Sequence, residues 1–219
     1  MFNFVSFALG LTFVLVTVSA DSAQIHWLSD YSEAKCLDGS PAAYYFQPAS
    51  KIRDSKKWVI YLAGGGECDT ESACKAQLTN ALGSSKYFAN SSDAAWWYLA
   101  SDNCDDNEGL CGYNHVLDPY CTQDLHAGQV TTPSEDNWSL YFSGHLVLKA
   151  TLDSLDQLYK LEEATEIILF GVSAGGIGVW MNVDYLAQRY PKAKVTAATV
   201  AGHYFYATYY TGVNYTAPS

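Results

Sequence analysis

The sequence is short of basic residues. It contains 12 Lys and Arg against 23 Asp and Glu, which gives a formal net charge of −11 at pH 7. This shortage argues against nucleic acid or an anionic membrane as a partner, because both attract positively charged surfaces. The acidic residues are spread along the chain, with their densest run at residues 101–109. Their simplest role is to keep the surface soluble, and they indicate no substrate.

Long hydrophobic runs are absent after residue 20, and no linker, repeat or low-complexity tract divides the chain. Residues 1–20 have no charged side chain and end in Val18-Ser19-Ala20, a pattern typical of a cleaved secretory signal. A signal anchor is the alternative. We therefore expect a signal peptide at residues 1–20, one domain at residues 21–219, no stable membrane insertion and a location outside the cell, for instance in a cell wall.

The sequence has no C-x-x-C pair, so its six cysteines do not show a common metal-ligand spacing. Their even number behind a signal peptide predicts disulfides. Two pairs enclose short loops that can close locally, which leaves one long-range pair. The resulting candidates are Cys68–Cys74, Cys104–Cys111 and Cys36–Cys121, although the sequence leaves other connectivities open.

Three Asn-x-Ser/Thr sequons are candidate glycosylation sites, at Asn90, Asn137 and Asn214. Each sequon is a weak signal by itself. Together they fit a secreted glycoprotein.

Short apolar or aromatic runs alternate with helical patterns along the chain. Strands are predicted at residues 42–46, 58–63, 115–120, 166–172 and 194–200, and helices at residues 140–161 and 174–190. Nearly continuous apolar strands separated by helices are typical of a largely parallel sheet covered on both faces. The predicted fold class is α/β.

The segment Phe170-Gly-Val-Ser-Ala-Gly-Gly places Ser173 between glycines 171 and 175, after an apolar strand and before a helix. This strand–turn–helix context is the one in which G-x-S-x-G forms a nucleophile elbow. A phosphate-binding turn is the alternative, because helix N-termini favour anions. No G-K-[ST] or dinucleotide fingerprint supports that alternative.

A second glycine-rich loop, Gly64-Gly65-Gly66, follows the strand predicted at residues 58–63. A serine nucleophile needs amide donors for the oxyanion of its tetrahedral intermediate. Glycines allow the backbone N–H groups to approach a substrate carbonyl, and the amide that follows the serine, from Ala174, completes such a hole. A loop made only for a tight turn is the alternative.

The motifs of this chain resemble those of the pectin acetylesterase and Notum family of serine carboxylesterases. The resemblance covers most of the chain after residue 35. It is carried by CLDGSPAAYYF (36–46), LAGGGEC (62–68), GSSKYF (83–88), DPYCTQDLHAG (118–128), LYFSG (140–144) and GVSAGGIGVWMNVDYLAQRYP (171–191). It implies an α/β-hydrolase-like fold, no metal or organic cofactor, Ser173 as nucleophile, and the amides of Gly65, Gly66 and Ala174 as oxyanion hole.

Two departures from the family pattern affect the substrate pocket. The family usually has tryptophans before the cysteine of the glycine loop, where this chain has Gly66-Glu67. After the next strand, an aromatic position of relatives is occupied by His203, followed by Tyr204. We expect Glu67, His203 and Tyr204 to line the pocket, and the identity of the substrate does not transfer from the family.

The partners of Ser173 are not evident in the sequence. In hydrolases of this architecture the acid and the histidine follow the serine, and here only Asp184 and His203 do so. Asp184 is eleven residues along the predicted helix, about 16 Å from the serine, so we assign it a structural role. We give His203 a pocket-lining role in preference to that of general base. The remaining histidines show no metal-ligand spacing.

These observations favour a chain that is incomplete at its C-terminus and has little activity by itself, because losing triad members lowers rates by orders of magnitude. The first hypothesis is a secreted esterase acting on acetyl, or less readily long-chain acyl, groups of a polysaccharide or glycoprotein. The alternative is an inactive fragment or pseudo-enzyme that binds glycans or acylated ligands through its many aromatic residues, such as those at 96–98 and 203–210.

Overall fold

The structure is a computed structural model that describes residues 22–93 and 97–203. The expected signal peptide, Tyr204 and the sequon at Asn214 lie outside the described residues.

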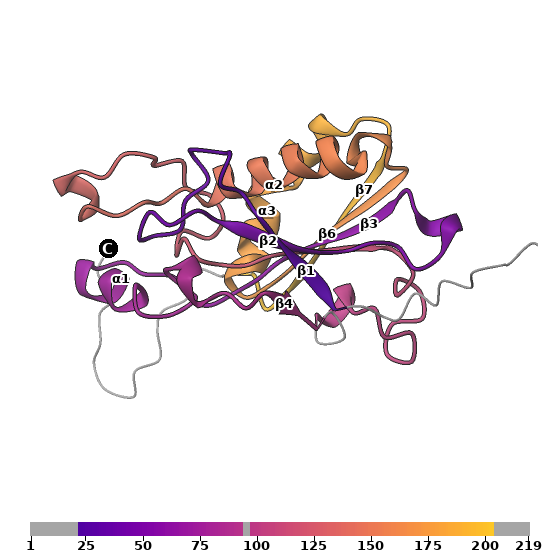
Figure 1. Ribbon diagram of the computed structural model, residues 1–219, viewed down its shortest axis with the longest axis horizontal. Coiled ribbons are helices and arrows are strands. Elements are labelled where there is room, and N and C mark those ends of the chain that lie inside the picture. The colour runs from indigo at the N-terminus through magenta and orange to yellow at the C-terminus, as the bar shows by residue number, and fades with distance from the viewer. Residues whose placement is uncertain (1–21, 94–96, 204–219) are drawn as a thin grey trace, which may run out of the picture.

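A seven-stranded mixed sheet runs through the molecule in the order β4-β1-β2-β5-β3-β6-β7 (Figure 1). Strands β5, β3, β6 and β7 pair in parallel, whereas β1, β2 and β4 are added by antiparallel pairing. The bounds are β1 (Ala23–Trp27), β2 (Ala43–Gln47), β3 (Lys57–Leu62), β4 (Ser91–Ser92), β5 (Asn114–Asp118), β6 (Glu166–Val172) and β7 (Lys194–Val200). The α/β class and the mostly parallel, hydrolase-like sheet are confirmed. All five strands expected from the sequence are present, and β1 and β4 are additional.

Within the part of the chain that the structure describes, three α-helices and five short 3₁₀ segments connect the strands. The bounds are α1 (Glu71–Gln77), α2 (Gly144–Tyr159), α3 (Ala174–Arg189), η1 (Ile52–Asp54), η2 (Ser85–Tyr87), η4 (Tyr98–Ala100), η5 (Glu135–Asn137) and η6 (Leu161–Glu163). Helix α2 ends where Lys160 adopts a left-handed conformation with φ 58°, a common way to stop a helix. The helix predicted at residues 140–161 is therefore shorter at both ends.

Both long helices pack on the same face of the sheet. Leu152 and Leu155 of α2 share one buried core with Val179 and Leu186 of α3 and with Ile60 of β3. The two helices are also joined through Arg189, whose guanidinium bonds Asp153 at 2.7 Å and also Asp156. This face carries the larger of the two sheet cores.

The opposite face is covered by irregular chain among the described residues, where the sequence predicted helices on both faces. The alternation along β3 directs Val59 and Tyr61 to this side, where they pack with Trp97, Ala100 and Tyr113. Large aromatic side chains from the segment 97–113 bury the sheet here, so no regular helix is needed.

Three disulfides join the described cysteines, and none is left free among them. They pair Cys36 with Cys121, Cys68 with Cys74, and Cys104 with Cys111, the pairing that loop length favoured in the sequence. Within residues 22–93 and 97–203, no helix is long and apolar enough to cross a membrane.

Candidate active site

The predicted elbow and glycine loop meet at the carboxyl end of the parallel strands. Leu62, the last residue of β3, pairs with Gly171 of β6 and with Asp118 at the end of β5. The loops that leave these strands therefore lie side by side at one edge of the sheet. This edge is where α/β sheets usually place their binding sites.

Ser173 lies between β6 and α3 with φ 55° and ψ −122°. A non-glycine residue with positive φ is strained, and such strain gathers at functional sites. The surrounding structure holds the conformation, because the Ser173 amide donates a 2.8 Å hydrogen bond to the carbonyl of Val200 on β7, and its carbonyl accepts from Ile177. The turn thus has the geometry of a nucleophile elbow.

The glycine loop lies directly against this turn. A methyl group on Gly175 would overlap the carbonyl oxygen of Leu62, and one on Gly64 would overlap the carbonyl of Val172 and come within 3.1 Å of the Ser173 Cβ. Glycine is required at both positions because the two backbones pass so closely. The close approach of the two motifs, which are separated by about a hundred residues, is produced by the parallel pairing of β3 with β6.

The three amides assigned to the oxyanion hole belong to this junction. Gly65 and Gly66 are exposed, Gly66 has φ +79°, and Ala174 is the first residue of α3. Among the described residues, the amides of Gly65 and Gly66 donate no hydrogen bond to the protein. They remain candidate donors to an oxyanion, as does the amide of Ala174 at the positive end of the helix dipole.

An open cavity of about 360 Å³ adjoins the first turns of α3. Its walls are Glu67, Leu125, Ile177, Trp180, Gly202 and His203. The structure therefore brings together Glu67 and His203, two of the residues expected to line the pocket, and adds Trp180, whose side chain is exposed. Sequence reasoning did not single out Trp180, although its position two turns after Ser173 places it on the same side of α3.

A hydrogen bond from His126 holds the residue that precedes the glycine loop. His126 is buried, its ring packs on Tyr120, and its Nε2 lies 2.9 Å from the carbonyl oxygen of Ala63, immediately before Gly64. Burial lowers the pKa of His126 to about 4, so at neutral pH the ring is uncharged and Nε2–H donates to that carbonyl. By residue type and spacing alone, this histidine does not stand out from the others in the sequence. Its only signal is its place within the family motif at 118–128.

The backbone that presents His126 is unusual. Gln123, Leu125 and His126 all have φ between 55° and 60°. The Leu125 amide donates to the Tyr120 hydroxyl at 2.9 Å, and Asn182 of α3 donates to the His126 carbonyl at 2.9 Å. Residues in a left-handed conformation do not form the hydrogen bonds of a helix or strand. Here side chains bond the backbone groups of Leu125 and His126 instead.

The side chain of α3 that bonds the neighbouring segments is Asn182, and not Asp184. The Asn182 amide nitrogen also bonds the Gly178 carbonyl at 2.8 Å, and its oxygen lies 2.7 Å from Nδ1 of His145. Asp184 is exposed, and its carboxylate makes no hydrogen bond or ion pair among the described residues. The structural role expected for Asp184 is therefore wrong, because position 184 faces water while position 182 faces the core.

Two carboxyl groups, the buried Asp118 and the half-buried Asp124, lie at the end of β5 and shortly after it, near the site. Asp118 is fully buried and neither of its oxygens has a hydrogen-bond partner among the described residues, so burial raises its pKa well above the usual value. Burial also raises the pKa of Asp124, but this carboxylate accepts bonds from Thr122 at 2.6 Å and from the Gly144 amide at 2.7 Å. Neither was recognised from the sequence, where Asp118 reads as part of a strand.

No histidine or carboxylate bonds the Ser173 hydroxyl within residues 22–93 and 97–203. His115 is buried, and burial lowers its pKa, while His26 stacks on Tyr44. The same residues contain no group of three or more His, Cys, Asp or Glu placed to hold a metal ion.

Of the candidate glycosylation sites, Asn90 is exposed. The Asn137 side chain is engaged, because its nitrogen donates to the Thr132 carbonyl at 3.0 Å and its oxygen accepts from the Ser134 amide at 2.7 Å. Asn90 is therefore the more accessible acceptor of the two.

Comparison with known proteins identifies the family. The model of the family described as pectinacetylesterase matches residues 16–218. Pectin acetylesterase 5 of Arabidopsis thaliana is 32% identical over 172 residues, which cover 78% of this chain and 39% of the relative. The palmitoleoyl-protein carboxylesterase NOTUM of Schmidtea mediterranea is 34% identical over 171 residues, covering 77% and 31%.

A solved structure supports the same assignment. The Wnt deacylase Notum from Drosophila superposes with a TM-score of 0.71 at 29% identity, covering 83% of this chain and 52% of that one. This chain spans less than half the length of the curated relatives named above.

Proposed function

Because the chain belongs to the pectinacetylesterase family, we propose that it is a secreted serine carboxylesterase that hydrolyses acyl esters, with acetyl as the preferred group, on a polysaccharide or glycoprotein. The observation that carries the proposal is the contact between the Ser173 turn and the glycine loop, where a methyl group on Gly64 would come within 3.1 Å of the Ser173 Cβ. A nucleophile and amide donors at such a junction are what acyl transfer requires.

In this reaction the Ser173 Oγ attacks the acyl carbon and its proton passes to a base. The carbonyl oxygen becomes an oxyanion that accepts hydrogen bonds from the amides of Gly65, Gly66 and Ala174. Collapse of the intermediate expels the sugar or protein hydroxyl and leaves an acyl-serine. Water then attacks the acyl carbon, which releases the carboxylic acid and restores the serine.

Three disulfides support secretion, because such bonds persist in oxidising compartments. The exposed sequon at Asn90 is in accord with it. Treatment of the protein from culture medium with a glycosidase that removes N-linked sugars should lower its apparent mass, and Asn90→Gln should lower it in the same way. A protein found only inside the cell and carrying no sugar would contradict this part of the proposal.

Fluorophosphonate labelling tests the nucleophile directly, because the probe reacts with activated serines. We expect labelling of Ser173 in the native protein and none in Ser173→Ala. Ester hydrolysis should fall by about 10⁴-fold or more in the variant. Ser84→Ala, which removes a buried hydroxyl far from the elbow in sequence, is the control. Equal hydrolysis by the native protein and by Ser173→Ala would overturn the mechanism.

The preference for a short acyl group rests on the cavity beside α3, where the exposed Glu67 forms part of the wall. Bringing a long alkyl chain against a carboxylate removes water from the charge, which is unfavourable. We expect p-nitrophenyl acetate to be hydrolysed with higher kcat/KM than the octanoate ester, and Glu67→Leu to reduce the difference. A preference for octanoate in the native protein would contradict the acetyl assignment.

A non-catalytic role is the second candidate. It is favoured by one observation, that no histidine or carboxylate forms a hydrogen bond with the Ser173 hydroxyl among the described residues. In this case the cavity lined by Leu125, Ile177 and Trp180 binds an acylated ligand without turnover. Absence of fluorophosphonate labelling, together with measurable binding of an acetylated oligosaccharide, would select this function over hydrolysis.

A further inference from the structure

A second cavity lies in a part of the molecule that the proposed hydrolysis does not use. Four of the 12 basic residues of this acidic chain fall between positions 51 and 57. Three of them, Lys51, Arg53 and Lys57, line a cavity of about 340 Å³. Positive charge is therefore gathered at one place in a protein that has little of it elsewhere.

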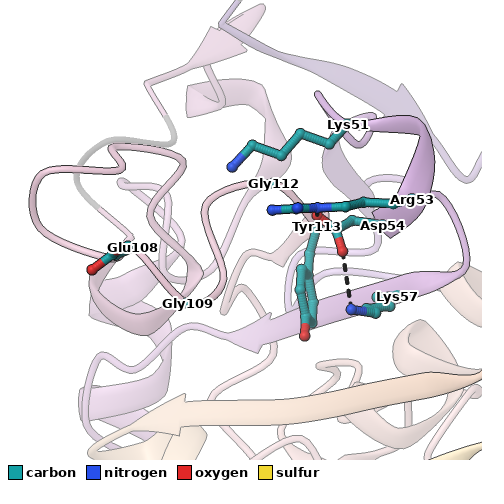
Figure 2. Close-up of a pocket in the computed structure, with 8 residues that line it drawn as sticks. All are labelled: Lys51, Arg53, Asp54, Lys57, Glu108, Gly109, Gly112 and Tyr113. Atoms are coloured by element: carbon teal, nitrogen blue, oxygen red, sulfur yellow. Dashed lines mark hydrogen bonds and ion pairs between the residues drawn. The ribbon is translucent and has the colours of Figure 1, made fainter.

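The cavity walls come from two distant parts of the chain (Figure 2). One wall is formed by η1 and the start of β3, and the other by the loop that precedes β5. The lining residues are Lys51, Arg53, Asp54, Lys57, Glu108, Gly109, Gly112 and Tyr113. The ring of Tyr113 forms part of the wall, and the Lys57 ammonium lies 5.1 Å from its centre.

The cavity lining holds more basic side chains than acidic ones that pair with them. Asp54 is paired with Lys57 at 3.0 Å and with Arg53 at 3.5 Å, and the Lys57 bond lowers the pKa of Asp54. Figure 2 shows the Glu108 carboxylate on the other side of the cavity, away from the cations. Among the described residues, the Lys51 ammonium forms no ion pair with a carboxylate.

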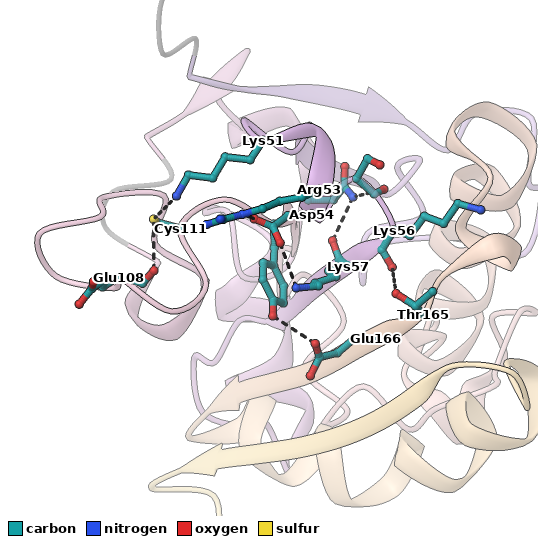
Figure 3. Close-up of polar contacts among 12 residues, drawn as sticks. Lys51, Arg53, Asp54, Lys56, Lys57, Glu108, Cys111, Thr165 and Glu166 are labelled. Carbon is teal, nitrogen blue, oxygen red and sulfur yellow. Dashed lines mark hydrogen bonds and ion pairs between the residues drawn. The ribbon is translucent and has the colours of Figure 1, made fainter.

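The Lys51 ammonium makes a long contact of 4.0 Å with a sulfur atom, the Sγ of Cys111 (Figure 3). Sulfur is a weak acceptor. The Arg53 side chain is 79% exposed and its single bond to Asp54 leaves most of its donors open. Two cations thus retain hydrogen-bonding capacity at the mouth of the cavity.

The walls are held in place independently of any ligand. The disulfide between Cys104 and Cys111 closes the loop of one wall. Asn114 donates to the carbonyls of Ser55 and Lys57 at 2.9 and 3.0 Å, which fastens that loop to the other wall. A preorganised site binds with less loss of conformational entropy.

This cavity and Ser173 lie at opposite ends of the sheet. Lys57 is the first residue of β3, while the glycine loop follows its last residue, Leu62. Six residues at about 3.3 Å each separate the two by about 20 Å. A group bound here is therefore not the ester under attack at Ser173.

We propose that the cavity is an accessory oxyanion site that binds the carboxylate of an acidic sugar residue. The Arg53 guanidinium offers the two parallel N–H donors that match a carboxylate, and the Lys51 ammonium adds a further donor. The volume suits a single sugar ring, whose hydroxyl groups can form hydrogen bonds with the charged side chains that make up most of the wall. The choice of a sugar as carrier of the carboxylate rests on the proposed function, whereas the oxyanion site itself does not.

Calorimetric titration of the full-length protein with Ser173→Ala in place tests this site without requiring hydrolysis. The probes are a galacturonate trisaccharide, the matching neutral galactose trisaccharide, and sodium sulfate. We expect the galacturonate trisaccharide to bind, the neutral one not to bind, and rising salt to weaken binding. Sulfate alone should compete only weakly, because it lacks the ring.

Matched variants locate the binding. Lys51→Met and Arg53→Gln should each weaken galacturonate binding about tenfold, as expected for a lost charged hydrogen bond. Lys56→Gln removes the same charge from an adjacent residue whose ammonium pairs with Glu163 outside the cavity, and should leave binding unchanged.

Three results would overturn the proposal: equal weakening by Lys56→Gln and Lys51→Met, equal binding of the neutral and acidic trisaccharides, or sulfate binding without galacturonate binding. None of them bears on fluorophosphonate labelling of Ser173, so failure of this proposal is distinguishable from failure of the proposed hydrolase.

Discussion

The two ends of the parallel strands have opposite chemistry. At the carboxyl end, around Ser173 and the glycine loop, exposed backbone amides and a strained turn provide the polar groups. At the amino end, Lys51, Arg53 and Lys57 provide charge from long side chains. The first end depends on backbones passing closely, and the second on a charge excess held by a short disulfide loop. One sheet thus keeps the proposed ester-hydrolysing site at one end of its parallel strands and the proposed carboxylate-binding site at the other.

The disulfides should reveal the largest difference between the two ends. Cys36–Cys121 spans 85 residues and fastens the segment that follows β5 at the serine end, whereas Cys104–Cys111 spans 7 residues beside the basic cavity. In the loop-entropy model, the double Cys→Ala variants lose about 4.5 and about 2.5 kcal/mol of unfolding free energy, respectively. Urea denaturation of both variants measures the difference. Equal losses would show that the loops do not dominate stability at either end.

Much of the carboxyl end of the sheet, where Ser173 lies, was predictable because short sequence motifs specify its turns. Ser173 with its flanking glycines, and Gly64 to Gly66 after an apolar strand, each predict their own turn, and family motifs relate them. The basic cavity was not predictable, because Lys51 and Gly112 are distant in sequence and meet only through the pairing of β3 with β5.

Strand β1 and helix α1 were also missed, for different reasons. The sequence of β1, AQIHW, alternates apolar and polar residues, so the period-two pattern of a strand was present there and was overlooked; β1 pairs antiparallel with β2. Helix α1 has seven residues, and it depends on the cap from Thr70 and on the disulfide from Cys74 to Cys68. Non-local contacts therefore decide α1, whereas local pattern predicted α2 and α3.

Glycine substitutions test whether the backbone is more tightly packed at the elbow than beside the basic cavity. Gly175→Ala places a methyl group against the carbonyl oxygen of Leu62, whereas a methyl group on Gly109 beside the basic cavity meets nothing within 4 Å. We expect Gly175→Ala to lower the unfolding free energy by about 3 kcal/mol, as overpacking against rigid backbone does. Gly109→Ala, the matched control, should change it by less than about 0.5 kcal/mol. If Gly175→Ala changes the unfolding free energy as little as Gly109→Ala does, the backbones of Gly175 and Leu62 do not pass as closely as the structure places them.

The smallest expected effect comes from the buried carboxyl of Asp118, and it is the only one of these effects that depends on pH. Because the folded-state pKa of Asp118 is raised, the folded protein keeps a proton that the unfolded chain has released above pH 3.8. The folded state then binds more protons, so stability from this group is present at low pH and declines as pH rises through the raised pKa. Asp118→Asn keeps the shape of the side chain but removes this decline.

We expect Asp118→Asn to stabilise the protein by about 1 kcal/mol at pH 7 and by little at pH 4, in urea denaturation at both values. Asp105→Asn removes an exposed carboxyl from the loop beside the basic cavity and is the matched control, with little change at either pH. A gain from Asp118→Asn that is equal at pH 4 and pH 7 would show that Asp118 does not titrate within this range.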